Sequence, residues 1–291
     1  MLLAALWINC QNWEHLEDEP VMANETMRAD AALVARGLVS SRQRAQALIM
    51  KGLATVNGAI IDKPARKVAE SDALAVIGDA HPYVSRGGLK LEKALQVFDV
   101  DVNGLVCLDV GASTGGFTDV LLQGGALHVY AVDVGVAQLH ESLRSDPRVT
   151  SMERVNARTL TRSMFPRLPA LAVMDVSFIS VRLILPALFD LLGDEGRVVS
   201  LIKPQFEAGR QRVGKRGIVS KTEIHRQVLQ AVVDFAPSLG WRVAGLDFSP
   251  IAGGDGNLEF LADIRPESRC ERPVDDAIIA DVVRRAHAAR L

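Results

Sequence analysis

The chain has 291 residues, of which 48% are apolar, 23% are charged and only 5% are aromatic. These values exclude a largely disordered chain and predict a folded protein with an aliphatic core. The formal net charge is −2, but the first 25 residues contain five acids and no Lys or Arg, so the rest of the chain is slightly basic.

Cysteine and histidine usage bears on the compartment and on metals. The chain has three widely separated cysteines, Cys10, Cys107 and Cys270, which predict neither a disulfide framework nor a Cys-x-x-Cys metal site. Six histidines are scattered without the spacing of a zinc site. No apolar run approaches the ~20 residues of a membrane-spanning helix, and the apolar start lacks a preceding basic residue. We therefore expect a cytoplasmic protein without a metal or a membrane segment.

The chain opens on a composition break and continues into a small domain. Residues 1–26 are rich in acids and show no clear periodicity, which predicts a disordered N-terminal extension. Residues 27–78 predict a small α+β domain with short strands. Within it, Asn57-Gly58 predicts a hairpin turn because both residues tolerate positive φ. Residues 79–85 predict a linker.

Basic side chains dominate this small domain. Eight Lys and Arg within residues 28–67 are opposed only by Asp30 and Asp62. Such an excess is typical of a surface that contacts a phosphate backbone, although a single basic cluster could also be a solvated helix face. The RNA-binding candidates of this domain are Arg28, Arg36, Arg42, Arg44, Lys51, Arg66 and Lys67. Further along the chain, the candidates are Arg86, Arg212, Lys215 and Arg216.

Residues 86–268 alternate between strand-like and helical patterns. The strand-like runs are residues 106–110, 128–132, 171–175, 197–202 and 258–264. The helical runs between them include residues 116–123, 181–192 and 221–235. Such alternation predicts a Rossmann-like α/β fold, in which a parallel sheet has helices on both faces. Apolar residues at helical spacing then predict a helical tail over residues 269–291.

A glycine-rich loop follows the first strand of this second domain. Residues 109–117 have the pattern Asp-x-Gly-x-x-x-Gly-Gly-Phe, which is similar to the cofactor loop of S-adenosylmethionine-dependent methyltransferases. Glycine in such a turn lets a ligand approach the backbone. Asp133 ends the second strand, where an acid can bind both ribose hydroxyls, and Asn156-Ala157 lie where such folds place the adenine. The cofactor-binding candidates are Asp109, Gly111, Ala112, Ser113, Thr114, Gly115, Gly116, Phe117, Asp133, Asn156, Ala157 and Asp175.

Four charged residues mark the sheet as a candidate catalytic site. They are Lys90, Asp175, Lys203 and Glu259, at the ends of predicted strands or just before the sheet. The carboxyl ends of parallel strands are where doubly wound folds place their active sites. A charge beside an apolar strand is costly unless it is paired, so two ordinary salt bridges would also explain these residues.

Several motifs in the correct order indicate a family. They comprise Arg28-Ala29-Asp30, residues 83–88, the glycine loop, and the segments 175–180, 203–207 and 214–219. Together they resemble the TlyA or hemolysin-A-like proteins, which join an S4-like RNA-binding domain to an FtsJ-like rRNA 2′-O-methyltransferase domain. The resemblance implies S-adenosylmethionine as the cofactor, ribosomal RNA or ribosomal subunits as partners, and a ribose 2′-hydroxyl, of cytidine, as the methyl acceptor.

The same resemblance implies roles for the four charged residues. Lys90, Asp175, Lys203 and Glu259 match the family's Lys-Asp-Lys-Glu tetrad, in which Lys203 would handle the 2′-hydroxyl proton. A lysine that acts as a base must be buried or lie beside a second cation, which Lys90 could supply. Two other interpretations stay open. One is a membrane-active hemolysin, and the other is an RNA-binding protein with an inactive methyltransferase fold.

Overall fold

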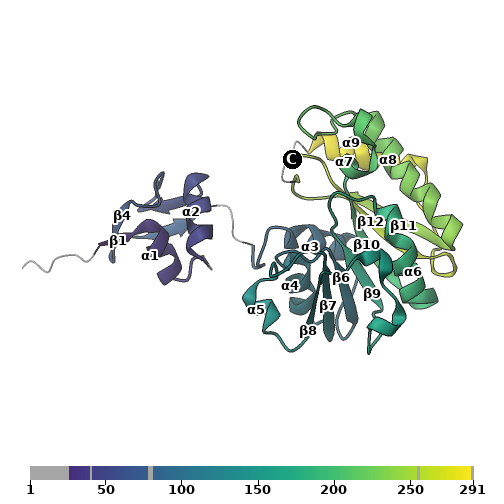
Figure 1. Cartoon of the computed structure of the whole chain (residues 1–291). Coiled ribbons are helices and arrows are strands. Elements are labelled where there is room, and N and C mark those ends of the chain that lie inside the picture. Colours follow the sequence, from purple (N-terminus) through teal and green to yellow (C-terminus); the bar gives the residue numbers. More distant parts are fainter. Residues whose placement is uncertain (1–25, 40, 78–80, 254–255, 290–291) are drawn as a thin grey trace, which may run out of the picture. The chain divides into compact units, whose positions relative to one another are not determined.

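The computed structural model of the chain describes residues 26–39, 41–77, 81–253 and 256–289, and Figure 1 shows its elements. These residues belong to two units, one within residues 1–80 and the other within residues 81–291. The predicted disordered extension lies outside the described residues except for Thr26, which begins the first strand. Each unit has its own apolar core, as a separately folding domain would.

The first unit is a small α+β domain. Its elements are β1 (Thr26–Arg28), α1 (Ala29–Ala35), α2 (Arg42–Met50), β2 (Ala54–Val56), β3 (Ala59–Ile60), β4 (Lys67–Ala69) and β5 (Leu74–Val76). β2 lies between β3 and β5, and β1 pairs with β4. Asn57 and Gly58 adopt positive φ between β2 and β3, which confirms the predicted hairpin turn. Leu33, Ile49 and Ile61 are fully buried and hold the two helices on the strands.

The second unit is built on a seven-stranded sheet of order β11-β12-β10-β9-β6-β7-β8. Its strands are β6 (Val106–Val110), β7 (His128–Asp133), β8 (Val149–Glu153), β9 (Leu171–Met174), β10 (Arg197–Ile202), β11 (Trp241–Phe248) and β12 (Phe260–Pro266). The strands β10, β9, β6, β7 and β8 are parallel, which confirms the predicted parallel sheet. β8 and β11 were not among the predicted strands. The prediction is wrong for β12, which pairs antiparallel with β10 and with β11.

Helices cover both faces of this sheet. They are α3 (Gly88–Val97), α4 (Gly116–Gln123), α5 (Glu141–Arg144), α6 (Leu185–Leu192), α7 (Pro204–Glu207), α8 (Thr222–Phe235) and α9 (Asp276–Ala288). Successive strand residues point to opposite faces, so Val173 packs with α3 and α4 while Met174 packs with α6. The result is the three-layer arrangement expected of a Rossmann-like fold (Figure 1).

The helical tail packs on the second unit. α9 buries Ile279, Val282 and Val283 against the core that also contains residues of α8 and β11. At its end, His287 Nε2 lies 2.9 Å from Nδ1 of the fully buried His225 on α8. Burial, reinforced by the charge of His287, lowers the pKa of His225 to about 4. The ring is therefore neutral in the folded protein at neutral pH.

Lowering the pH from 7 to 5 is expected to destabilise the protein through this histidine. An unfolded histidine has a pKa of about 6.5, so the unfolded chain takes up a proton that the folded chain resists. The contribution to stability is complete above pH ~6.5 and decreases by up to about 1.4 kcal/mol per unit as the pH falls toward 4. Urea unfolding of the parent and of His225→Gln between pH 7.5 and 4.5 measures it. We expect a shallower slope in the variant, and identical slopes would contradict the assignment.

Candidate active site

A cavity of about 380 Å³ lies at the carboxyl ends of β6, β7 and β9. The glycine loop forms one wall, and its geometry demands glycine. Gly111 has a φ of +82°, and a Cβ there would lie 2.5 Å from the carbonyl oxygen of Asp175. Gly115 has a φ of +98°, and a Cβ there would collide with Leu143. Glycine at these two positions lets the loop pack closely against Asp175 and Leu143. Gly111 and Ser113 of the loop line the cavity.

Asp133 ends β7 and lines the cavity. Its Oδ2 accepts a hydrogen bond of 2.8 Å from the amide of Ser113, and its Oδ1 accepts one of 2.7 Å from the amide of Gly135. A carboxylate has room for about four hydrogen bonds, so capacity remains for two ligand hydroxyls. The backbone donors fix the orientation of this acceptor before any ligand binds.

The predicted cofactor residues divide between the wall of the cavity and the structure behind it. Those that line it are Gly111, Ser113, Asp133, Asn156, Ala157 and Asp175. Those that do not are Asp109, Ala112, Thr114, Gly115, Gly116 and Phe117. Asn156 also caps a short 3-10 turn, since its side-chain oxygen accepts from the amide of Arg158 at 3.1 Å.

Asp109 lies beneath the loop and is fully buried. Its Oδ2 accepts a hydrogen bond of 2.7 Å from the hydroxyl of Thr118. Burial raises the pKa of Asp109 to about 7, the nearby charges of Asp175 and Asp133 act in the same direction, and the Thr118 hydrogen bond opposes them. The structure therefore gives Asp109 a supporting position under the cavity wall instead of a direct place in it.

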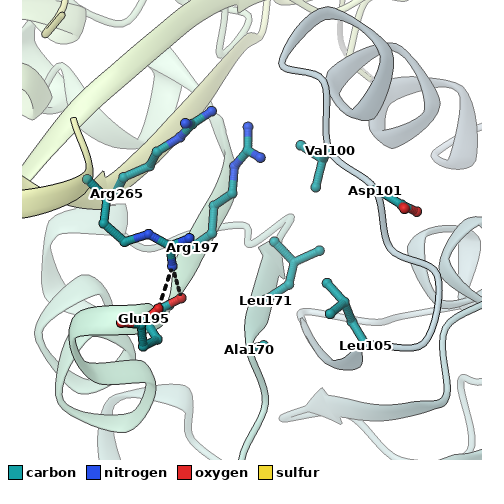
Figure 2. A pocket seen from close by; sticks show the side chains of 10 residues that line it. Val100, Asp101, Leu105, Ala170, Leu171, Glu195, Arg197 and Arg265 are labelled. Atoms are coloured by element: carbon teal, nitrogen blue, oxygen red, sulfur yellow. Dashed lines mark hydrogen bonds and ion pairs between the residues drawn. The ribbon is translucent and has the colours of Figure 1, made fainter. Parts of the chain in front are cut away.

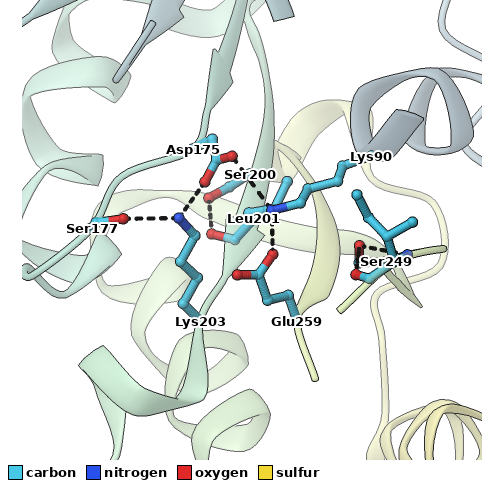
Figure 3. Close-up of polar contacts among 9 residues, drawn as sticks. Lys90, Asp175, Ser177, Ser200, Leu201, Lys203, Ser249 and Glu259 are labelled. Carbon is cyan, nitrogen blue, oxygen red and sulfur yellow. Dashed lines mark hydrogen bonds and ion pairs between the residues drawn. The ribbon is translucent and has the colours of Figure 1, made fainter. Parts of the chain in front are cut away.

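The four predicted catalytic residues form one continuous row beside the cavity (Figure 3). Lys203 Nζ lies 2.5 Å from Asp175 Oδ1 and 3.0 Å from Ser177 Oγ. Asp175 Oδ2 lies 3.8 Å from Lys90 Nζ, which in turn donates to Glu259 Oε2 at 2.6 Å. Lys90, Lys203 and Glu259 are buried. The row alternates cation and anion, with the Asp175 carboxylate between the two ammonium groups.

Four separate elements bring the row together. Asp175 and Lys203 directly follow β9 and β10, at the carboxyl edge of the sheet. Lys90 lies in the first turn of α3. Glu259 directly precedes β12, and it reaches the same edge because β12 runs opposite to β10. The strand was predicted but its direction was not, and its antiparallel direction is what brings Glu259 to the site.

Phe178 is a site residue to which the sequence prediction gave no role. It lines the cavity three residues after Asp175, with 90% of its surface exposed. Its φ is +65°, a value that a bulky side chain rarely adopts. Its ring lies 5.1 Å from that of Phe206 on α7. Strain and exposure of an aromatic ring together indicate a functional position. The signal in the sequence was an aromatic residue between a strand end and the next helix.

Several predicted RNA-binding residues of the first unit are engaged within it. The buried Asp30 accepts hydrogen bonds from Arg28 at 3.0 Å and from Arg42 at 3.1 Å. The bond from Arg28 is the main reason that the pKa of Asp30 lies well below its usual range. Arg36 donates to the carbonyl oxygens of Ala69, Glu70 and Asp72. The side chain of Arg44 lies outside what the structure describes.

The other candidates face solvent. Lys51, Arg66 and Lys67 are exposed on the first unit. On the second unit, Arg86, Lys215 and Arg216 are exposed, and Arg212 donates to Gln227 at 2.8 Å. Arg212 lies beside a hollow of about 530 Å³, which is also lined by its neighbour Arg210 and by Arg182, a residue that the prediction did not include. The predicted basic stretch is thus part of a wider basic surface.

A further pocket of about 220 Å³ lies at the other end of the parallel strands, where β6, β9 and β10 begin (Figure 2). Its three arginines are already paired: Arg197 and Arg265 bind the buried Asp263, and Arg269 binds Glu195. These contacts hold strand ends together, and nothing in the pocket points to a reaction.

The described residues offer neither a membrane span nor a metal site. No helix within them is long and apolar enough to cross a membrane. They also contain no group of three or more His, Cys, Asp or Glu side chains that could hold a metal ion.

Comparison with known proteins gives two family matches. Residues 83–264 match the FtsJ-like methyltransferase family, and residues 27–74 match the S4 domain. A candidate rRNA methyltransferase of Bacillus subtilis, YqxC, is 47% identical over 88% of this chain and 95% of its own. The 16S/23S rRNA (cytidine-2′-O)-methyltransferase TlyA of Mycobacterium tuberculosis is 44% identical over 89% and 96%. A solved structure, of a candidate hemolysin from Streptococcus thermophilus, is 49% identical over 92% and 98%, with a TM-score of 0.72.

Proposed function

This chain belongs to the FtsJ-like methyltransferases, within the TlyA or hemolysin-A-like group, and we propose that it methylates a ribose 2′-hydroxyl of ribosomal RNA. The observation that carries the proposal is the row of Lys203, Asp175, Lys90 and Glu259 beside a cavity for the methyl donor. The name of the Mycobacterium tuberculosis relative supports cytidine as the acceptor and both ribosomal subunits as sources of it.

S-adenosylmethionine fits the cavity as the methyl donor. Gly111 lets the loop pass against the Asp175 backbone at the cavity wall, where a Cβ would lie 2.5 Å from the Asp175 carbonyl oxygen. Asp133 has lone pairs free for two ribose hydroxyls. Asn156 and Ala157 line the part of the cavity suited to the adenine. When bound, the sulfonium supplies an electrophilic methyl group, so the protein has mainly to align the acceptor oxygen with it.

The residues of the row would then orient the acceptor and manage its proton. Lys203 Nζ lies at the end of the row nearest Ser177 and is the group that would hold the 2′-oxygen. Asp175 and Glu259 keep the two ammonium groups in fixed positions through contacts of 2.5 and 2.6 Å. Such fixed charges need no reorganisation during the reaction.

Phe178 would hold the base of the target nucleotide. Its exposed ring lies beside the cavity, and base stacking on an aromatic ring is worth ~1–3 kcal/mol. A ribose hydroxyl can reach a buried amine only when its nucleotide leaves the stack, and an aromatic platform stabilises that state.

The S4 domain would supply affinity for the RNA backbone. We expect Arg42→Ala to weaken rRNA binding and to flatten its salt dependence by about 0.7–0.9 log–log units per lost phosphate contact. Asp30 keeps its bonds to Arg28 and Gln46 in this variant, so the domain should stay folded. Filter binding across a salt series measures the slope. Arg284→Ala on α9 is the charge-matched control, and equal slopes would show that Arg42 serves only Asp30.

The decisive test of the function is a map of ribose methylation. We expect rRNA from cells that contain the protein to carry a 2′-O-methylcytidine that disappears when the gene is deleted and returns with the parent sequence. The purified protein should restore the mark on unmodified subunits with S-adenosylmethionine. In the cell, the proposed place of the reaction is the cytoplasm, where subunits assemble. The proposal fails if no ribose mark changes although the protein is present and binds rRNA.

A further inference from the structure

Residues at the carboxyl end of β11 contact helix α3, which carries Lys90. Lys93, one turn after Lys90, donates to the carbonyl oxygen of Phe248 at 2.6 Å. Its Nζ lies 3.2 Å from Asp247 Oδ2 and 3.7 Å from the centre of the Phe248 ring. A lysine held by a carbonyl, a carboxylate and an aromatic face is fixed more firmly than an ordinary surface lysine.

The C-terminal helix contacts the same two residues from another direction. Arg285 of α9 donates to Asp247 Oδ1 at 3.1 Å, and its guanidinium carbon lies 5.6 Å from the centre of the Phe248 ring. The Asp247 carboxylate, which is nearly buried, therefore bridges α3 and α9. Asp281 holds Arg285 from within α9 at 2.8 Å.

The same segment also contacts Glu259, at the end of the row that holds Lys90. Ser249, directly after Phe248, donates its amide hydrogen to the carbonyl oxygen of Glu259 at 2.8 Å. The side chain of Glu259 accepts from Lys90 at 2.6 Å, and α3 leads from Lys90 back to Lys93. The position of Lys90 is thus set twice, by Glu259 and by the attachment of its helix at Lys93. Both attachments come from the β11–β12 pair.

We propose that Asp247 is a positioning residue for Lys90, acting through Lys93, and that Arg285 extends this attachment to the C-terminal helix. The proposal rests on the proposed function, since it assigns Asp247 an effect on methyl transfer. Asp247 itself lies outside the row and does not line the cavity. Its effect is therefore expected in kcat, with little change in the KM for either substrate.

Two variants test the link between Asp247 and Lys93. Asp247→Asn keeps the shape of the side chain, and Lys93→Met keeps the aliphatic stem, so both should fold. Each is expected to lower kcat about tenfold or more, because small displacements of reacting groups cost up to ~10²-fold. The double variant should lose little more than either single variant, since the Lys93–Asp247 contact is lost in both. Independent, multiplying losses, or a kcat unchanged in both, would overturn the proposal.

Arg285 supplies the matched comparison. Arg285→Ala should lower kcat several-fold, and Arg285→Lys should restore most of it. Arg284→Ala removes the neighbouring arginine, which contacts only Asp281 among the pairs described, and should leave kcat unchanged. An equal loss in Arg284→Ala would mean that charge on α9, not this contact, is responsible.

Amide hydrogen exchange separates this proposal from the proposed function. Peptides from residues 88–97 should exchange faster in Asp247→Asn than in the parent, and Arg284→Ala should match the parent. If residues 88–97 exchange faster in Asp247→Asn but the parent protein methylates no RNA, the attachment of α3 is supported and the proposed function is wrong. If exchange and kcat are both unchanged in Asp247→Asn, the attachment proposal is wrong and the proposed function is unaffected.

Discussion

Lys203→Ala is expected to abolish detectable methyl transfer while the protein stays folded and still binds its substrates. The variant removes the amine that lies 2.5 Å from Asp175 and 3.0 Å from Ser177 at the carboxyl end of β10. Loss of general acid–base chemistry alone costs ~10²–10⁴-fold in rate. Loss of alignment of the acceptor oxygen adds to this, so turnover should fall below detection.

Single-turnover methylation at saturating rRNA and methyl donor measures this effect, with a melting curve beside it. If the four residues of the row only formed structural salt bridges, Lys203→Ala would show near-normal methyl transfer and a lower melting temperature, because Asp175 would lose a partner. Arg284→Ala removes an exposed positive charge from the same domain, outside the row and the RNA-binding candidates, and controls for the loss of basic charge. A folded Lys203→Ala that methylates within a few-fold of the parent would show that the row is not the catalytic centre.

Asp133→Ala should weaken binding of S-adenosylmethionine by two orders of magnitude or more, with rRNA affinity unchanged. Each charge-assisted hydrogen bond to a ribose hydroxyl is worth ~1.5–3 kcal/mol, and two would be lost. The amides of Ser113 and Gly135 also lose their acceptor, so the glycine loop loses an anchor.

Calorimetric titration with S-adenosylmethionine measures the change. Asp146→Ala is the control, because Asp146 pairs with Arg148 outside the cavity. Asp133→Asn keeps one acceptor and should fall between the parent and the alanine variant. Equal affinity in all four proteins would rule out Asp133 as the ribose ligand.

The sequence predicts the parallel part of the sheet well, because buried parallel strands are short, continuous apolar runs. Residues 106–110 and 197–202 are strands with the predicted bounds. Edge strands were harder to find. β8 (Val149–Glu153) contains Thr150, Ser151 and Glu153 and is half exposed, so it has no apolar run. Strand direction is not encoded in such a pattern at all, which explains the error at β12.

Charge patterns in the sequence identify the row but not how charges pair elsewhere. Lys90, Asp175, Lys203 and Glu259 come together as the family motif implies. By contrast, counting basic residues cannot show that Arg28 and Arg42 both hold the buried Asp30. Nor could it show that Asp109 is sealed beneath the loop, since burial depends on α4 packing over it. The left-handed backbone of Phe178 is a property of the folded loop alone.

The late position of Glu259 affects when the protein can become active during its own synthesis. Lys90 and its partner Glu259 are 169 residues apart in the chain, and β12 must insert between β10 and β11 before they meet. A chain that grows from its N-terminus thus completes its RNA-contacting domain first and carries Asp175 and Lys203 before the row can close. Contacts of such long range form slowly. A nascent chain can therefore bind RNA well before it can modify it.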